Sequence, residues 1–159
     1  MRFNNQKAKS SVVTLYFIFV VLFVFATVFF DAIKSFIGGG RMRYIFLFSG
    51  LGIVLFFAHK VCKYFEYDSE GNILVIVNKG IMLSDFLNYR ENRAELPKKK
   101  LLYFKLNNYG IYKSLNLYFK THGDKQKRLK FNVTLVSNKK LKYLKQSLDK
   151  VVKQNKFDA

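Results

Sequence analysis

The stretch Val12–Phe30, "VVTLYFIFVVLFVFATVFF", holds nineteen consecutive residues without a charged side chain. As an α-helix it would rise about 28 Å at about 1.5 Å per residue, close to the thickness of a bilayer's hydrocarbon core. A buried core helix of this kind would need a larger globular partner than the chain provides. A secretory signal fits poorly, because the apolar region is long and no small-residue cleavage site follows it. The stretch therefore predicts a transmembrane helix over about residues 12–33.

A second apolar run, Tyr44–Ala58 ("YIFLFSGLGIVLFFA"), has fifteen residues before His59 and Lys60 interrupt it. Its length is near the range of buried or re-entrant segments, but apolar residues resume at Val61 and flanking cations can extend to the membrane interfaces. We expect a second span over about residues 44–62. Three glycines, Gly38–Gly40, favour a turn between the runs, so residues 11–63 are predicted to form a transmembrane helical hairpin after an N-terminal tail, residues 1–10.

Charge indicates the orientation of this hairpin. Lys and Arg outnumber Asp and Glu by 28 to 10, and most of the cations follow the second apolar run. Positively charged segments are retained on the cytoplasmic side. We therefore expect a multi-pass protein of the bacterial inner membrane with both termini in the cytoplasm. The single cysteine, Cys62, rules out an internal disulfide and fits a reducing compartment.

Beyond residue 63 the apolar pattern changes from continuous to alternating, which favours strands. The segment "YFEYDSEGNILVIV", Tyr64–Val77, indicates a strand, a turn and a strand. Ile81–Asn88 is either a short strand or a connection, and Glu91–Lys100, which is polar and contains proline, is predicted to be a loop. Three further strands are expected from the alternation of Leu102, Phe104 and Leu106, then of Leu115, Leu117 and Phe119, then of Leu129, Phe131, Val133 and Leu135.

The last predicted element is an amphipathic helix over residues 138–154, capped by Ser137 or Asn138. One apolar stripe is predicted to face the core, and the lysines 139, 142, 150 and 153 lie off it. The stripe consists of Leu141, Leu144, Leu148, Val151 and Val152. An antiparallel sheet or barrel closed by this helix would bury the apolar residues of the strands against the apolar stripe of the helix. Residues 64–155 are therefore expected to form one basic domain.

Element order and two stretches, "ELPKKKLLYFKL" (Glu95–Leu106) and "RLKFNVTLVSNKKLKYLKQSL" (Arg128–Leu148), resemble small bacterial two-helix membrane proteins with a pleckstrin-homology-like domain. The resemblance implies an α+β membrane protein: a hairpin, then a PH-like antiparallel sheet or barrel capped by a C-terminal helix. It does not carry over a phosphoinositide site. Eukaryotic lipid-binding members have basic residues in the first hairpin turn, whereas Asp68–Asn72, "DSEGN", is acidic.

Residues for catalysis are sparse. "HKVC" places His59 and Cys62 on one helical face, but nothing nearby supplies further metal ligands, so an interfacial histidine beside a small buried residue is the simpler interpretation. His122 lies in a predicted turn and is expected to be solvated. Neither an activated nucleophile nor a carboxylate pair is visible. We expect a protein that is not an enzyme and needs no cofactor.

Basic residues supply the functional hypothesis. Pro97 is expected to lead into a strand on which Lys98 and Lys100 share one direction and Lys99 the other. Lys98 and Lys100, together with a second cluster at residues 125–130, are predicted to contact anionic lipid headgroups. Each lysine near a membrane would contribute about 1 kcal/mol to the attraction. The predicted residues are Lys98, Lys100, Lys125, Lys127, Arg128 and Lys130.

The sequence favours a non-enzymatic, membrane-anchored interaction module or accessory subunit, with a protein partner that it does not identify. A solvated charged surface is the plain alternative for the two clusters. A second alternative is a tethered domain that binds RNA or a ribosome, with Tyr103, Tyr112 and Tyr118 stacking on bases. The most distant alternative is an enzyme of unknown type.

Overall fold

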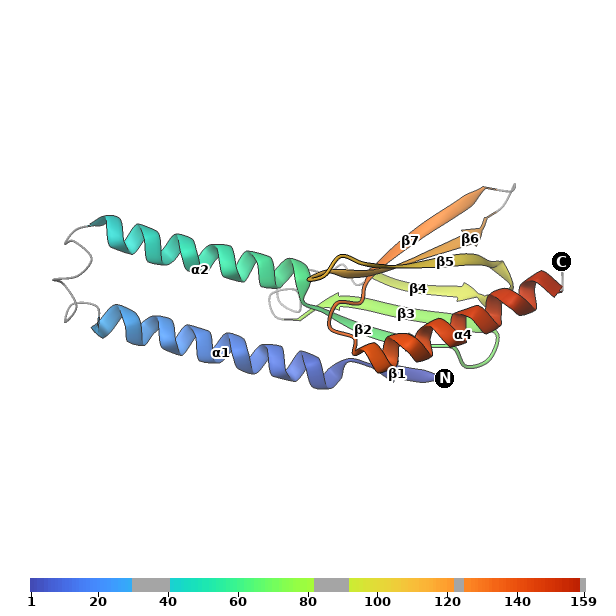
Figure 1. The fold of residues 1–159 in the computed structure, drawn as a ribbon, viewed down its shortest axis with the longest axis horizontal. Coiled ribbons are helices and arrows are strands. Elements are labelled where there is room, and N and C mark those ends of the chain that lie inside the picture. The colour runs from blue at the N-terminus through green and yellow to red at the C-terminus, as the bar shows by residue number, and fades with distance from the viewer. Residues whose placement is uncertain (30–40, 82–91, 122–124, 158–159) are drawn as a thin grey trace.

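The structure, a computed structural model, describes residues 1–29, 41–81, 92–121 and 125–157. It is an α+β fold in which two helices extend to one end and two antiparallel sheets with a C-terminal helix form the other (Figure 1). The helices are α1 (Gln6–Phe29), α2 (Arg41–Val61) and α4 (Asn138–Phe157). The first sheet contains β1 (Arg2–Asn4), β2 (Lys63–Asp68), β3 (Ile73–Gly80) and β4 (Asn92–Pro97), and the second contains β5 (Leu101–Asn108), β6 (Lys113–Lys120) and β7 (Gln126–Asn132).

Helix α1 is apolar on all sides, and its side chains are exposed. Leu15 is 63% and Phe17 70% accessible. Within the described residues, Gln6–Thr27 is long and apolar enough to cross a membrane, and an 18-residue window within it has a mean hydropathy of 2.3. Helix α2 lies alongside it, and the rings of Phe23 and Phe48 meet edge to face with centroids 5.5 Å apart. The predicted link at Gly38–Gly40 lies outside the described residues.

The expectation of an N-terminal tail over residues 1–10 is wrong for its first residues, which form β1. Arg2, Phe3 and Asn4 pair antiparallel with Asp68, Tyr67 and Glu66 of β2. The Phe3 ring packs on the rings of Phe65 and Tyr67, with centroid distances of 6.1 and 5.4 Å. The sequence does not reveal this strand, because three residues are too few to show an alternating pattern.

Asn5 joins β1 to α1 and is only 3% exposed. Its amide Nδ2 donates to the carbonyl of Lys63 (3.0 Å), and its Oδ1 accepts the backbone N–H of Phe65 (2.9 Å). Its own carbonyl accepts the N–H of Lys9 (3.0 Å), which starts the helix. One buried side chain therefore continues the β1–β2 ladder at the point where the chain turns into α1.

The predicted loop Glu91–Lys100 is mostly strand. Residues 92–97 form β4 and pair with Ile73–Asn78 of β3, so polar side chains here mark an exposed edge strand. Pro97 ends that strand, where a missing N–H costs no ladder bond. Lys98–Lys100 form a 3₁₀ turn, η2, instead of the predicted alternating strand. The segment Ile81–Asn88 lies almost entirely outside the described residues.

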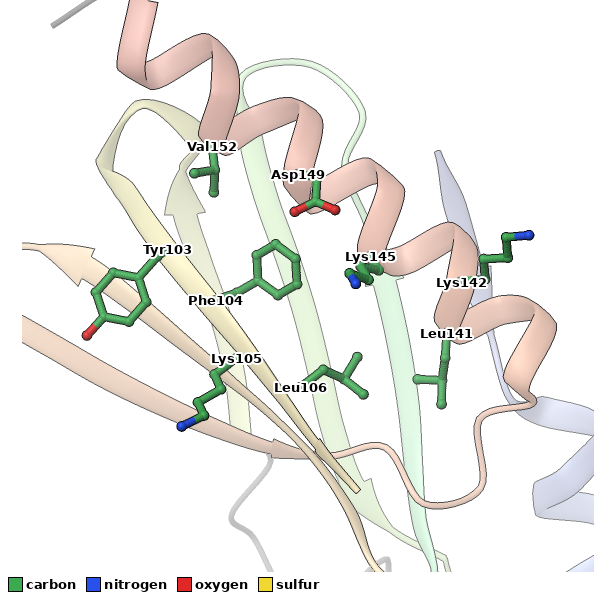
Figure 2. Close-up of a pocket in the computed structure, with 9 residues that line it drawn as sticks. All are labelled: Tyr103, Phe104, Lys105, Leu106, Leu141, Lys142, Lys145, Asp149 and Val152. Carbon is green, nitrogen blue, oxygen red and sulfur yellow. The ribbon is translucent and has the colours of Figure 1, made fainter. Parts of the chain in front are cut away.

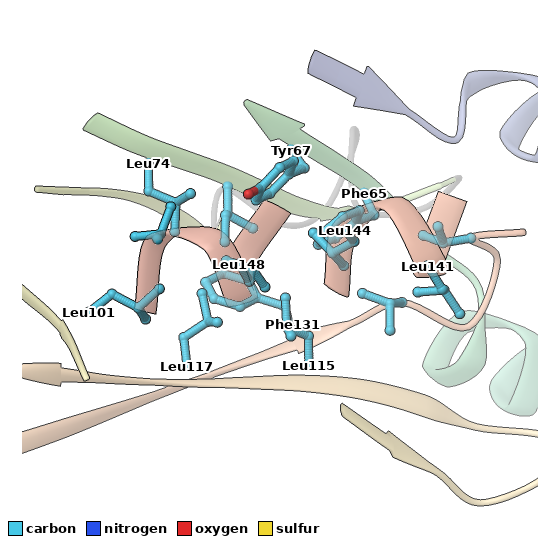
Figure 3. Close-up of a cluster of buried hydrophobic side chains, with 14 of the residues drawn as sticks. Phe65, Tyr67, Leu74, Leu101, Leu115, Leu117, Phe131, Leu141, Leu144 and Leu148 are labelled. Carbon is cyan, nitrogen blue, oxygen red and sulfur yellow. The ribbon is translucent and has the colours of Figure 1, made fainter. Parts of the chain in front are cut away.

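The core lies between the two sheets and α4 (Figure 3). The apolar alternation on β6 is confirmed, with Leu115, Leu117 and Phe119 all buried. On β5 the register shifts between Leu101 and Tyr103, so Leu101, not Leu102, is the buried residue at its start. The predicted last strand is also too long. β7 ends at Asn132, and Val133 and Val136 are buried in the connection to α4.

A buried amide, Asn78, links the two sheets. Its Nδ2 donates to the carbonyls of Tyr64 (3.0 Å) and Asn132 (2.8 Å), and its Oδ1 accepts the N–H of Asn132 (3.1 Å). Asn132 in turn donates to the carbonyl of Val61, the last residue of α2 (3.0 Å). These bonds connect the end of α2 to both sheets.

The predicted C-terminal helix is confirmed. Leu141, Leu144, Leu148 and Val151 are buried, Val152 is partly buried, and the flanking lysines are exposed. Ser137 is the capping residue, since its hydroxyl accepts the N–H of Lys140 (3.4 Å). The hydroxyls of Tyr67 and Ser147 lie 2.9 Å apart, so a polar contact also joins α4 to β2.

Leu148→Ala is expected to lower the free energy of unfolding by about 2–5 kcal/mol, because it removes a side chain with no exposed surface from the core. Lys142→Ala, on the exposed face of the same helix, serves as the control and is expected to be nearly neutral. Urea unfolding of the full chain in detergent micelles, followed by near-UV circular dichroism, measures both. Equal effects would contradict the packing of α4.

Asn5→Ala is expected to cost about 1–3 kcal/mol, because the Phe65 N–H and the Lys63 carbonyl lose their partner in a buried position. Gln6→Ala, at the exposed neighbouring position, is the matched control. The same unfolding measurement applies. An Asn5→Ala protein as stable as the parent would mean that the junction is not held by this side chain.

Candidate functional site

A groove with a volume of about 630 Å³ lies between β5 and α4 (Figure 2). Its lining is apolar at the centre and charged at the rim. It consists of Tyr103, Phe104, Lys105, Leu106, Leu141, Lys142, Lys145, Asp149 and Val152. We call it the β5–α4 groove.

Strand alternation and helix periodicity build this groove. Phe104 and Leu106 come from β5, with Leu141 and Val152 from α4 (Figure 2). β5 is the terminal strand of its sheet, so no described strand pairs with the edge that faces the groove. The Asn155 amide donates to the carbonyls of Lys98 and Leu101 (2.7 and 2.8 Å) and holds the end of α4 at the start of β5.

The rim of the groove carries Lys105, Lys142 and Lys145 against the carboxylate of Asp149. The lining residues include no histidine, cysteine, serine or threonine. An apolar floor, an unpaired strand edge and a positive rim suit an extended segment with apolar and acidic side chains.

Lys98 is placed differently from its predicted role. Its ammonium donates to the carbonyls of Ser69 and Gly71, both at 2.6 Å, and its backbone N–H donates to the carbonyl of Asn72 (2.9 Å). The side chain thus fixes the β2–β3 turn, where Gly71 has a φ of +59°. Lys98 and Lys100 do not share a strand face, because both belong to the 3₁₀ turn η2.

Lys100, Lys125 and Lys127, from the two predicted clusters, lie at the same end of the second sheet, whereas Lys130 lies toward the other end of β7. Leu101, next to η2, pairs with Phe119, which pairs with Lys127. Lys100, Lys125, Lys127, Arg128 and Lys130 are exposed.

The end that carries Lys100, Lys125 and Lys127 is opposite the helices (Figure 1), about 20 Å away for a strand of six residues. That separation exceeds two Debye lengths at physiological salt, so these three cations are poorly placed to contact a membrane that α1 would cross. Lys130 is closer to the helices, because it is two residues from Asn132, which hydrogen-bonds to Val61 at the end of α2.

A second group of cations lies at the helix junction itself. A groove of about 270 Å³ is lined there by Gln6, Lys9, Tyr64, Glu66, Val77, Lys79 and Arg93. The ammoniums of Lys9 and Lys79 lie 5.8 and 5.6 Å from the centroid of the Tyr64 ring. The Tyr64 hydroxyl donates to Glu66 (3.0 Å). Burial is the main cause that raises the pKa of Tyr64 to about 12, and the hydrogen bond to Glu66 is the second cause. The phenol is therefore neutral and remains a donor at physiological pH.

Metal ligands do not cluster in the described residues, where no group of three or more His, Cys, Asp or Glu side chains is placed to hold an ion. Cys62 follows α2 and is partly buried. The backbone of His59 lies within α2, and His122 falls outside the described residues.

The β5–α4 groove was not predicted from the sequence. The apolar alternation of Phe104 and Leu106 and the α4 stripe were both recognised, and both were assigned to the core. In the structure Phe104, Leu106 and Val152 pack against the core but are only partly buried, and the same side chains line the groove. Comparison of the chain with protein-family models, curated proteins and solved structures gives no match.

Proposed function

We propose that this protein is a non-enzymatic, membrane-anchored interaction module. In this proposal α1 and α2 both cross one bilayer as a hairpin, and the two sheets with α4 stand on its cytoplasmic side. The excess of cations in the sheet domain supports that side, as expected for a bacterial inner-membrane protein. The observation that carries the topology is the pairing of β1 with β2.

Because β1 precedes α1 and β2 follows α2, the chain leaves one sheet and returns to the same sheet. A chain that crosses a bilayer and returns must cross an even number of times. If α1 spans the membrane, as its apolar surface favours, the chain between residues 30 and 62 must provide a second crossing. α2 has 21 residues, enough for about 31 Å at about 1.5 Å per residue.

We further propose that the sheet domain is PH-like. Support comes from the division into four and three antiparallel strands and from the terminal helix that packs on the core. The hairpin would then be inserted between the first two strands. The N-terminal residues would complete the first sheet, so the domain would be assembled only after both crossings have been made.

The partner that fits the β5–α4 groove is an extended protein segment with apolar and acidic side chains. Its backbone would add to the free edge of β5, its apolar side chains would contact Phe104 and Val152, and its carboxylates would meet Lys142 and Lys145. Lys9 and Lys79, beside α1, are better placed for contacts to anionic headgroups than Lys98 and Lys100, the residues that the sequence predicts.

Topology is tested by cysteine labelling of intact cells in a Cys62→Ser background. Asn4→Cys and Lys139→Cys are expected to be protected from a membrane-impermeant maleimide, whereas Gly39→Cys, between the two helices, is expected to react. Permeabilised cells provide the control for reactivity. Protection of Asn4→Cys with labelling of Lys139→Cys would contradict an even number of crossings.

Occupancy of the groove is tested by in vivo photo-crosslinking from benzoylphenylalanine placed at Val152. A discrete adduct is expected, and Lys142→Glu with Lys145→Glu should reduce it several-fold by reversing the charge of the rim. The same probe at the exposed Lys153 is the positional control. Adducts that contain only a second copy of this chain, or equal adducts from residues 152 and 153, would contradict the proposed partner.

A further inference from the structure

We infer that the outer face of the second sheet binds single-stranded nucleic acid. This tyrosine face is defined by Tyr103, Lys105, Tyr112, Tyr118, Arg128 and Lys130. It shares Tyr103 and Lys105 with the rim of the β5–α4 groove, whereas its other members lie outside the groove lining. The inference does not rest on the proposed protein partner.

Strand register assembles the face from side chains far apart in the sequence. Tyr103 pairs with Tyr118 and Tyr118 with Arg128, which forms one row across β5, β6 and β7. Two residues along each strand, Lys105, Asn116 and Lys130 form a second row. Residues two apart on a strand point to the same side, so both rows share the face opposite the core.

The first row presents a flat aromatic surface. The rings of Tyr103 and Tyr118 are stacked, with centroids 4.2 Å apart and planes 14° from parallel. Tyr103 is 45% exposed, so it offers ring surface to a ligand while Tyr118 supports it. Such rings bind bases by stacking, whatever the base, and this is the usual platform for single strands.

Cations flank that surface in fixed positions. The Arg128 guanidinium donates through Nε and Nη2 to Oδ1 of Asn116 (3.3 and 3.0 Å), and Asn116 is only 1% exposed. Arg128 is thereby oriented and retains other N–H donors for a phosphate. The Lys130 ammonium lies 5.2 Å from the centroid of the Tyr112 ring. Strands β5, β6 and β7 contain no Asp or Glu.

A single strand fits this combination better than the other anions do. The row of Tyr103, Tyr118 and Arg128 lies toward the end of the sheet away from α1 and α2, where headgroups of the anchoring membrane are out of reach (Figure 1). An acidic protein segment would be attracted by the cations but has no use for an exposed stacked ring. Alternating phosphates and bases use both features.

The test is the fluorescence anisotropy of a labelled twelve-nucleotide uridine RNA titrated with the full chain in nonionic detergent micelles. Tyr103→Ala is expected to weaken binding at least about fivefold, because one stacked base loses its platform. Tyr103→Phe keeps the ring and should bind as the parent does. Near-UV circular dichroism of Tyr103→Ala should show the parent's unfolding midpoint, since the side chain is outside the core.

The charge contribution is measured with Lys130→Gln and with Lys153→Gln, an equal charge change on α4. Lys130→Gln should weaken binding and reduce the slope of log K against log salt by about 0.7, the value for one phosphate contact on a single strand. Lys153→Gln should change neither. Four results would each overturn the inference. They are no binding of the RNA at low salt, equal affinity of the parent and Tyr103→Ala, and equal effects of Lys130→Gln and Lys153→Gln. The fourth is competition by polyglutamate that is as effective as competition by unlabelled RNA of the same charge.

Discussion

The pairing of Arg2–Asn4 with Glu66–Asp68 is the constraint on which the rest of the architecture depends. It joins residues about sixty positions apart and encloses both long helices between two neighbouring strands. Its outward side chains reinforce it, since the Arg2 guanidinium lies 3.0 Å from the Glu66 carboxylate. Its inward side chain, Phe3, packs on the core. A loop of this length is costly to close by three residue pairs alone, so the buried amide of Asn5 and the Phe3 contacts are needed to hold it.

This arrangement divides the molecule into regions with different roles. The helices form the apolar end, the junction beside Tyr64 carries cations close to where α1 begins, and the sheets carry the β5–α4 groove and the tyrosine face. Lys98 and Arg128 show that two cations of this domain have different structural surroundings. The Lys98 ammonium is used by the β2–β3 turn, whereas Arg128 is an exposed residue whose guanidinium is held by the buried Asn116.

The sequence predicts those elements that repeat their pattern over several turns or pairs. The α1 run, the α4 stripe and the β6 alternation each supply three or more consistent apolar positions, and all three are found in the structure. β1 has three residues and β4 has polar side chains at an exposed edge, so neither shows a period. The shift at Leu101 and the turn at Lys98–Lys100 depend on how the two sheets meet, which no local pattern encodes. The β5–α4 groove exists only once β5 and α4 are packed together. The sequence offers Tyr103 and Tyr118 as base-stacking residues of the RNA-binding alternative, but their contact with each other requires the β5–β6 register.

A disulfide between Arg2→Cys and Asp68→Cys, in a Cys62→Ser background, tests the central claim most directly. The Ser69 N–H donates to the Met1 carbonyl and the Asn5 N–H to the Phe65 carbonyl, so Arg2 and Asp68 oppose each other at a non-hydrogen-bonded position. The Cα atoms of such pairs are about 4.5 Å apart, within the range that a disulfide spans. Mild oxidation of the full chain in isolated membranes should cross-link this pair readily, and Arg2→Cys with Glu70→Cys, which is out of register, much less. Absence of the first disulfide, or equal formation of both, would contradict the β1–β2 pairing and with it the even number of crossings.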